Sequence, residues 1–196
     1  MRGFIIFSNY AKIKVMEFIK TTLKDVYLIK PQVFGDNRGF FLEFYSKKKF
    51  KEAGINTEFV QDNHSKSEKK GTLRGMHFQL NPHAQAKLLR VVKGSIYDVV
   101  VDLRKDSETF GKWEGFELTA ENFQILFVPR GFAHGFMTLE DDTEVLYKAD
   151  NFYQPEAEGG IAWNDPDLKI NWPIENPILS ERDQKWPNFK DLKKIF

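Results

Sequence analysis

The stretch Leu73-Arg74-Gly75-Met76-His77-Phe78-Gln79 places one histidine between an arginine and a strand-like apolar run, ahead of Lys87. A second histidine lies in the later stretch Val128-Pro129-Arg130-Gly131-Phe132-Ala133-His134-Gly135-Phe136. Both stretches are punctuated by glycine and read as strands rather than as one face of a helix. A neutral imidazole is the side chain best suited to remove a proton near pH 7. The two stretches therefore indicate a β-rich enzyme and make proton transfer the first chemistry to test.

Runs rich in Val, Ile, Phe and Tyr recur along the rest of the chain between clusters of turn residues, as short strands do. We predict strands at residues 26–29, 39–45, 57–61, 71–78, 86–92, 95–103, 115–118, 124–128, 135–139 and 144–149. Lys93-Gly94 is predicted to be a hairpin turn. The only helices expected are a short one after Ser46, capped by that serine and ended at Gly54, and a terminal turn within 188–196. Many short strands at regular spacing predict an all-β jelly roll.

Composition bounds the domain organisation and the partners. The 196 residues carry 29 basic and 28 acidic side chains, so the net charge of +1 creates no global field for nucleic acid. The chain has no cysteine, which excludes disulfides and thiolate nucleophiles and fits a cytoplasmic protein. The apolar run 3–7 is too short to cross a membrane. No repeat or linker divides residues 16–196, which we predict to be a single domain with a tail of ordered, proline-rich loops after Asp150. Residues 1–15 are interpreted as an N-terminal extension, because Met16 resembles a second start; an additional N-terminal strand is the alternative.

The spacing Gly71 to His77, followed by Pro129-x-Gly131-x-x-His134, resembles the two motifs of the cupin superfamily. This resemblance implies a cupin-type double-stranded β-helix with a few short helices. Metal-binding cupins continue the first motif as His-x-His, whereas this chain has Gln79 at the second ligand position. Two histidines without a third ligand make a poor catalytic metal site. We therefore expect no metal, and the chemistry considered below requires no other cofactor.

Seven blocks of sequence narrow the resemblance to the dTDP-4-dehydrorhamnose 3,5-epimerase family. They occur in order, at the spacing of the family, and together cover essentially residues 16–187. The blocks are Phe34-Gly35-Asp36-Asn37-Arg38-Gly39-Phe40-Phe41-Leu42-Glu43, Phe59-Val60-Gln61-Asp62-Asn63-His64-Ser65, the two histidine stretches quoted above, Leu146-Tyr147-Lys148-Ala149, Trp163-Asn164-Asp165 and Leu179-Ser180-x-x-Asp183. The resemblance implies inversion of the two carbons that flank the C4 ketone of a dTDP-linked 6-deoxy-hexulose.

The resemblance also implies roles for individual residues. His77 would be the base that takes the C3 and C5 protons, and Asp183 would hold its far ring nitrogen. Lys87 would lie against the C4 oxygen and stabilise negative charge there, while Tyr147 would return a proton on the opposite face of the sugar. Further side chains would bind the substrate. These are Arg38, Arg74 and Arg182 at the diphosphate, Glu43, Gln61, Asp62 and Asn63 at thymine and sugar edges, Tyr153 stacked on thymine, Glu158 at the nucleotide, and His134 at the sugar.

Plainer interpretations stand beside these assignments. A histidine in a strand is often a hydrogen-bonded core residue, and surface charge is the default for Lys and Arg. Asp and Asn frequently make turns, which applies to the 61–63 cluster. We assign no site role to His64 or His83. Three rival functions remain open: epimerisation of one carbon of a related dTDP-ketosugar, a non-catalytic sugar-nucleotide-binding cupin, and a metal-dependent cupin oxygenase. The family resemblance further implies a homodimer in which N-terminal strands complete the partner's sheet.

Overall fold

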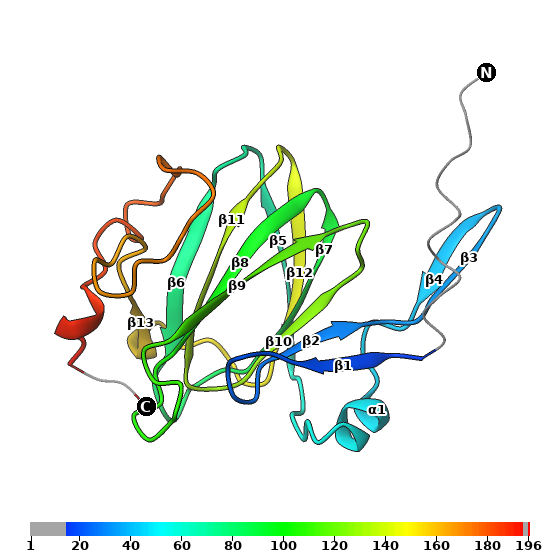
Figure 1. Ribbon diagram of the computed structural model, residues 1–196, viewed down its shortest axis with the longest axis horizontal. Coiled ribbons are helices and arrows are strands. Elements are labelled where there is room, and N and C mark those ends of the chain that lie inside the picture. Colours follow the sequence, from blue (N-terminus) through cyan, green and yellow to red (C-terminus); the bar gives the residue numbers. More distant parts are fainter. Residues whose placement is uncertain (1–14, 194–195) are drawn as a thin grey trace.

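The computed structural model describes residues 15–193 and 196, and nearly all of its regular structure is strand (Figure 1). The strands are β1 (Glu17–Lys20), β2 (Tyr27–Lys30), β3 (Val33–Asp36), β4 (Gly39–Leu42), β5 (Gln61–Ser67), β6 (Leu73–Gln79), β7 (Lys87–Lys93), β8 (Ser95–Asp102), β9 (Trp113–Thr119), β10 (Ile125–Val128), β11 (Phe132–Thr138), β12 (Thr143–Ala149) and β13 (Glu158–Gly160). The helices are α1 (Lys47–Glu52) and the short 3-10 helices η2 (Pro155–Ala157) and η3 (Phe189–Asp191). Among the helices of these residues, none is long and apolar enough to span a membrane.

Two antiparallel sheets face each other (Figure 1). The six-stranded sheet has the order β1-β2-β10-β7-β12-β5, and the five-stranded sheet has the order β13-β6-β11-β8-β9. From β5 to β8, and again from β9 to β12, each strand lies in the sheet opposite to the one before it. This alternation is the winding of a double-stranded β-helix, and it confirms the predicted jelly-roll fold with few short helices.

The core between the sheets follows from the two-residue period of the strands, which turns alternate side chains to one face. Leu89 and Val91 of β7 meet Ile96 and Val100 of β8, and all four are almost completely buried. Burial of each such side chain contributes roughly 1.5–3 kcal/mol. A second apolar layer packs on the outer face of the six-stranded sheet, where Phe50 of α1 is fully buried. The few polar residues that face the interior are therefore exceptions to this apolar pattern.

Several elements differ from the sequence-based predictions. Lys93-Gly94 is not a hairpin turn, because β7 pairs with β10 and β12 whereas β8 pairs with β9 and β11. The predicted strand at 57–61 is wrong, since β5 begins only at Gln61 and runs through a polar sequence that pairs with β12. Pairing has overridden intrinsic strand preference there. The short strands β1, β3 and β13 were not predicted. Helix α1 lies where the sequence places it, but the Ser46 side chain makes no capping hydrogen bond.

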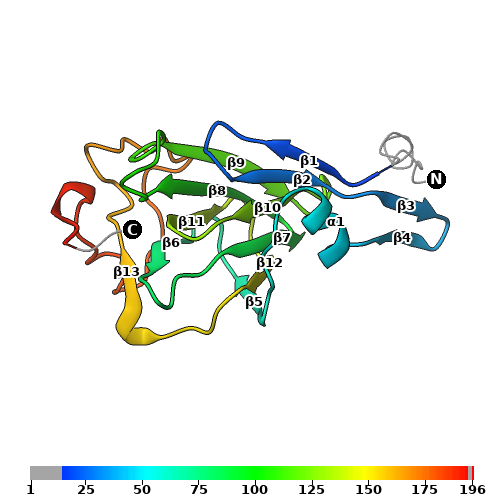
Figure 2. The same ribbon diagram turned by 90° about the horizontal axis from the view of Figure 1, so that it is seen from below.

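A two-stranded hairpin and the C-terminal tail lie at opposite ends of the molecule (Figures 1 and 2). Strands β3 and β4 pair with each other only and project away from the sheets, with Phe34 and Phe41 more than half exposed. After residue 150 the described part of the tail is mostly irregular, as predicted, and it joins the five-stranded sheet through β13. Its apolar residues pack mainly on the outer face of the five-stranded sheet, where Ile161 and Leu168 join Met76 and Val99 in one cluster. Only the part around residues 178–183 reaches the space between the sheets.

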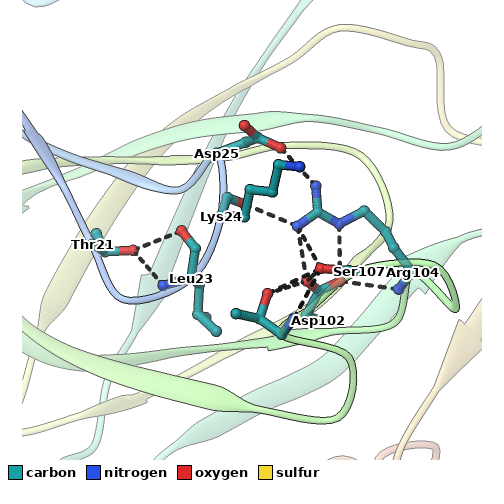
Figure 3. Close-up of polar contacts among 8 residues, drawn as sticks. Thr21, Leu23, Lys24, Asp25, Asp102, Arg104 and Ser107 are labelled. Atoms are coloured by element: carbon teal, nitrogen blue, oxygen red, sulfur yellow. Dashed lines mark hydrogen bonds and ion pairs between the residues drawn. The ribbon is translucent and has the colours of Figure 1, made fainter.

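A buried carboxylate ties the start of the fold to the end of β8 (Figure 3). Asp102 is completely buried and accepts hydrogen bonds from Arg104, Ser107 and Thr109. Arg104 in turn donates to Asp25 at 2.9 Å and to the backbone oxygen of Lys24 at 2.9 Å. Although burial opposes ionisation, these donors lower the pKa of Asp102 below its usual range. This network is structural, because none of its members lines the cavity described next.

Candidate active site

A cavity of about 420 Å³ opens between the two sheets, a volume within the range of small-molecule sites. The five-stranded sheet contributes His77 from β6 and His134 from β11 to its lining. The six-stranded sheet contributes Lys87 from β7 and Tyr147 from β12, and Asp183 reaches the cavity from the tail. The fold therefore gathers the four residues expected to be catalytic around one cavity, with His77 facing Lys87 and Tyr147 from the opposite sheet.

His77 and Asp183 form a hydrogen-bonded pair at this cavity. The Nε2 atom of His77 lies 2.6 Å from Oδ1 of Asp183, whose residue is only 4% exposed. The indole Nε1 of Trp186 donates to the same oxygen at 3.3 Å. Burial by itself raises the pKa of Asp183, but the hydrogen bond and charge of His77, together with Ser180 and Trp186, lower it to about 2. With Nε2 occupied by a carboxylate, Nδ1 is the nitrogen left to accept a proton.

The position of His77 depends on an unusually close approach of β6 and β11. His77 and His134 are direct partners in the register of these strands. Gly75 has φ +129°, and a side chain built on it would come within 2.5 Å of the Gly135 Cα atom. Glycine at both positions lets the two backbones approach where side chains would keep them apart. The glycines of the two histidine stretches thus bring the two imidazoles side by side.

Lys87 is partly buried at the cavity, and no hydrogen bond or ion pair is formed by its ammonium group within the described residues. Its shielding from bulk water lowers the pKa of Lys87 to about 8, while the carboxylates of Asp98 and Glu158 act in the opposite direction. Because the ammonium group has no protein partner, its charge is available to a ligand that enters the cavity. Tyr147 lies on the neighbouring strand β12, where burial raises the pKa of its phenol and keeps it protonated near neutral pH.

The second histidine also has a carboxylate behind it. His134 is 9% exposed, and its Nε2 atom lies 3.0 Å and 2.9 Å from the two oxygens of Asp98. Asp98 belongs to β8 and is completely buried. Burial raises its pKa, and the influences that oppose the rise come from His134 and Lys87. The five-stranded sheet therefore presents two histidines to one cavity, and each is hydrogen-bonded to an aspartate.

A second lobe of about 320 Å³ shares His77, Lys87, Tyr147 and Arg182 with the first. Its other lining residues include four that the sequence assigns to substrate binding: Gln61, Asn63, Tyr153 and Glu158. Arg182 makes a two-pronged contact with the Glu158 carboxylate, at 3.0 Å and 2.8 Å, and the Tyr153 hydroxyl donates to Glu158 at 3.1 Å. The lobe is polar and carries both charges. It extends the site from the shared catalytic candidates towards Tyr153 and Glu158.

Comparison with known proteins gives a consistent result. The family model described as dTDP-4-dehydrorhamnose 3,5-epimerase matches residues 20–191. A protein of that name from Shigella flexneri is 54% identical over 177 residues, which cover 90% of this chain and 97% of that protein. The chain belongs to the dTDP-4-dehydrorhamnose 3,5-epimerase family. The resemblance drawn from the seven sequence blocks is confirmed.

Solved structures extend this result to the fold of the epimerase family. The crystal structure of dTDP-4-dehydrorhamnose 3,5-epimerase from Bacillus anthracis, with TDP and pyrophosphate bound, has a TM-score of 0.87 and 51% identity, covering 89% of this chain and 99% of that one. The 3,5-epimerase from Legionella pneumophila, in complex with dTDP-4-keto-L-rhamnose, has a TM-score of 0.86 and 41% identity, covering 90% of this chain and 94% of that one. Sites in these relatives hold the nucleotide and the sugar.

Three residues that the epimerase resemblance assigns to substrate do not reach either lobe. Arg38 lies on the β3–β4 hairpin, where its side chain is 85% exposed and pairs with Asp36. Glu43 follows the hairpin and pairs with Lys49. Asp62 alternates with Gln61 and Asn63 on β5, so it points to the outer face and pairs with Lys148 at 2.7 Å. Arg74 does line the main cavity, held by Ser67 and the Lys66 backbone.

Asp98 is a residue of this candidate site that the sequence analysis did not select. The signal was present, because Ser95–Asp102 is an otherwise apolar run and position 98 falls between the interior-facing Ile96 and Val100. An acid at such a position is buried, and a buried acid needs a partner. In the described part of the chain, no group of three or more acidic or histidine side chains could hold a metal ion. His83 lies outside both lobes, as does His64, which is hydrogen-bonded to Glu144.

Proposed function

We propose that this chain inverts C3 and C5 of dTDP-4-dehydro-6-deoxy-D-glucose and yields dTDP-4-dehydro-L-rhamnose, as its relatives are named for doing. The observation that carries the proposal is the His77–Asp183 pair facing Lys87 and Tyr147 across one cavity. The chemistry is proton abstraction and return next to a ketone, which needs a base, a group that stabilises an enolate and an acid on the other face. Each of these parts has a side chain at the cavity.

His77 serves as the base through Nδ1, because Nε2 is engaged by Asp183. The electron pair of the C–H bond moves towards the ketone and forms an enolate, while the proton passes to the imidazole. Asp183 stays ionised and stabilises the imidazolium, as a carboxylate does in hydrolase triads. Its low pKa of about 2 keeps it charged at neutral pH. Both carbons are α to the same ketone, so one base position serves both in turn.

Lys87 stabilises the enolate oxygen. A charge aimed at the atom where negative charge develops is among the strongest catalytic devices in a site shielded from water. The ammonium group has no hydrogen-bond partner among the described residues to compete with that oxygen. Since the pKa of Lys87 is lowered to about 8, its charge is present at neutral pH and is lost on the alkaline side.

Tyr147 returns the proton on the face opposite His77. Inversion requires that the incoming proton arrive from the other side of the planar enolate. Tyr147 belongs to the six-stranded sheet and His77 to the five-stranded sheet, so a sugar held between the sheets has one group on each side. Raised by burial, the pKa of the phenol keeps its proton available. The diphosphate and thymine would occupy the second lobe, near Arg182, Glu158 and Tyr153, with Arg74 at the rim of the first.

The test is incubation with the substrate in D2O, with deuterium read at each sugar carbon by NMR. Label at both C3 and C5, with the L-lyxo product trapped by a reductase, is the expected result. Label at one carbon would replace the proposal with a single-carbon epimerase. No label, with dTDP still bound, would leave a sugar-nucleotide-binding cupin. Stoichiometric iron in the purified protein would favour the oxygenase alternative instead.

We propose further that the protein is a homodimer and that Arg38 and Glu43 serve the cavity of the partner. The β3–β4 hairpin supports this idea because it projects from the body and exposes Phe34, Phe40 and Phe41. Exposed apolar patches of this kind mark protein contacts. Mixing an Arg38→Ala chain with a His77→Ala chain tests it, since a mixed dimer would contain one complete site. Recovery of activity on mixing is expected, and no recovery between two folded dimeric variants would contradict it.

Two further proposals concern the extent and location of the enzyme. We propose that residues 16–196 form the complete catalytic domain, since the family model spans residues 20–191 within it. Deletion of residues 1–15 would then leave turnover unchanged. The cysteine-free composition supports a cytoplasmic location. Localisation of a tagged full chain by fractionation tests that point.

A further inference from the structure

Asp98 has no role in the reaction steps assigned to His77, Lys87 and Tyr147. It lies on β8, between Ile96 and Val100 on the face that packs into the core, and it is completely buried. Placing an ionised carboxylate there costs several kcal/mol unless charged or polar partners compensate. An apolar side chain could occupy this position without that cost in free energy. We therefore look for the role of the acid in its effect on neighbouring side chains.

Its first neighbour is His134. Both carboxylate oxygens lie within 3.0 Å of Nε2, so the ring donates that N–H to Asp98 whichever oxygen it favours. The tautomer and the ring orientation are then fixed, and Nδ1 is left for a ligand in the cavity that His134 lines. The arrangement repeats that of His77 and Asp183 on the adjacent strand.

Its second neighbour is Lys87. Of the carboxylates that act on this ammonium group, Asp98 has the larger effect and Glu158 the smaller. Glu158 is already paired with Arg182 in a two-pronged contact, which offsets its charge. The remaining titratable groups around the cavity are His77, His134, Tyr147, Arg74 and Asp183. Asp98 is consequently the carboxylate best placed to keep Lys87 protonated.

We propose that Asp98 is a positioning residue. It fixes the His134 ring and keeps Lys87 positively charged in the cavity, so that both groups can act on the C4 oxygen. The proposal rests on the function proposed above, in which Lys87 stabilises the enolate. One buried carboxylate would thus prepare both His134 and Lys87, which line the same cavity from opposite sheets. Asp98 itself touches no substrate, since it does not line either lobe.

The test compares Asp98→Asn with Asp102→Asn. Asp102 is a matched control because it is equally buried on the same strand, yet its partners belong to the Arg104 network. The pKa of Lys87 is read from the pH dependence of its labelling by fluorodinitrobenzene, which attacks only the neutral amine, with the labelled peptide measured by mass spectrometry. In Asp98→Asn we expect the midpoint to fall by about one pH unit from about 8. The alkaline limb of kcat/KM should fall with it, with dTDP affinity unchanged. Asp102→Asn should shift neither.

An unshifted midpoint in folded Asp98→Asn would overturn the proposal. If that variant does not fold, Asp98→Ser replaces it: the buried charge is again removed, so the midpoint should again fall. No fall would overturn the proposal in the same way. Labelling does not require turnover, so the result stands apart from the D2O experiment. A protein that shows no exchange at C3 or C5 would refute the proposed function, whereas the midpoint would still report on Asp98.

Discussion

Replacing Asp183 by asparagine removes the charge behind His77 while keeping the size of the side chain. The wild-type carboxyl has a pKa of about 2, against an ordinary value near 3.9. The difference of about 1.9 units corresponds to about 2.6 kcal/mol in favour of the ionised form. His77 supplies the largest part of that preference, through its hydrogen bond and its charge. The carboxylate stabilises the positive charge that the His77 ring gains with the proton, so proton abstraction becomes harder without it.

Loss of this stabilisation, up to about 2.6 kcal/mol, predicts that Asp183→Asn slows proton abstraction by up to about 80-fold. The assay is single-turnover uptake of deuterium at C3 and C5, with dTDP affinity measured by calorimetry on the same preparation. Affinity should fall by much less than the rate, because Asp183 lines the main cavity and reaches the second lobe only through Arg182, which lies 3.5 Å away. Asp165→Asn is the control: Asp165 is a buried tail carboxylate that accepts three backbone N–H groups and lies outside the cavity. It should lower stability without an 80-fold effect on folded enzyme. A rate within threefold of wild type in Asp183→Asn would refute the reasoning, as would an equal loss of dTDP affinity.

The remaining predictions concern stability and the second proton transfer. Because the pKa of Asp183 is depressed in the fold, its stabilisation is complete above about pH 4 and is lost as the pH falls through about 2. Urea unfolding at several pH values should therefore show wild type and Asp183→Asn converging by up to about 2.6 kcal/mol as acid is added. The Tyr147→Phe variant should still exchange the proton that His77 removes, but it should not complete the inversion. NMR of the trapped products distinguishes exchange from inversion. Asp102→Ala removes the buried carboxylate that pairs with Arg104 and should lower the free energy of unfolding by roughly 3–5 kcal/mol, measured by urea denaturation. Turnover by the folded fraction should be unchanged.

The sequence was most informative where glycine and histidine occur together. Gly75 and Gly135 are needed because β6 and β11 approach closely, and the same approach brings His77 beside His134. The local sequence therefore indicated both the histidines that could transfer protons and the close approach of the two strands that hold them. The jelly roll followed from repeated short strands, whose existence is encoded locally even where their boundaries are not. Strand β5 is the exception: its polar sequence has no strand signal, and pairing with β12 decides its conformation.

Other parts of the site depend on information that no local pattern contains. Asp62 belongs to a block that resembles the family, but the period of a strand turns it to the outer face while its two neighbours face the second lobe. Arg38 and Glu43 lie on or beside a hairpin whose direction is set by its exit from the six-stranded sheet, so one chain alone does not bring them to the cavity. Asp98 was missed because its partner His134 comes from a strand 36 residues later.

The division of labour between the sheets explains why this fold suits an inversion. A planar enolate must lose its proton to one face and regain it from the other, so the groups that act on it have to stand on opposite sides. In a sandwich, the inward side chains of each sheet reach a shared cavity from opposite directions. Both histidines come from the five-stranded sheet, and Lys87 and Tyr147 come from the six-stranded sheet. A carboxylate is hydrogen-bonded to each histidine: Asp183 of the tail, which lines the cavity, and Asp98 of β8, which lies behind it. Because both carboxylates are almost fully buried, water screens them little, and small changes in their charge should be felt directly at the reacting atoms.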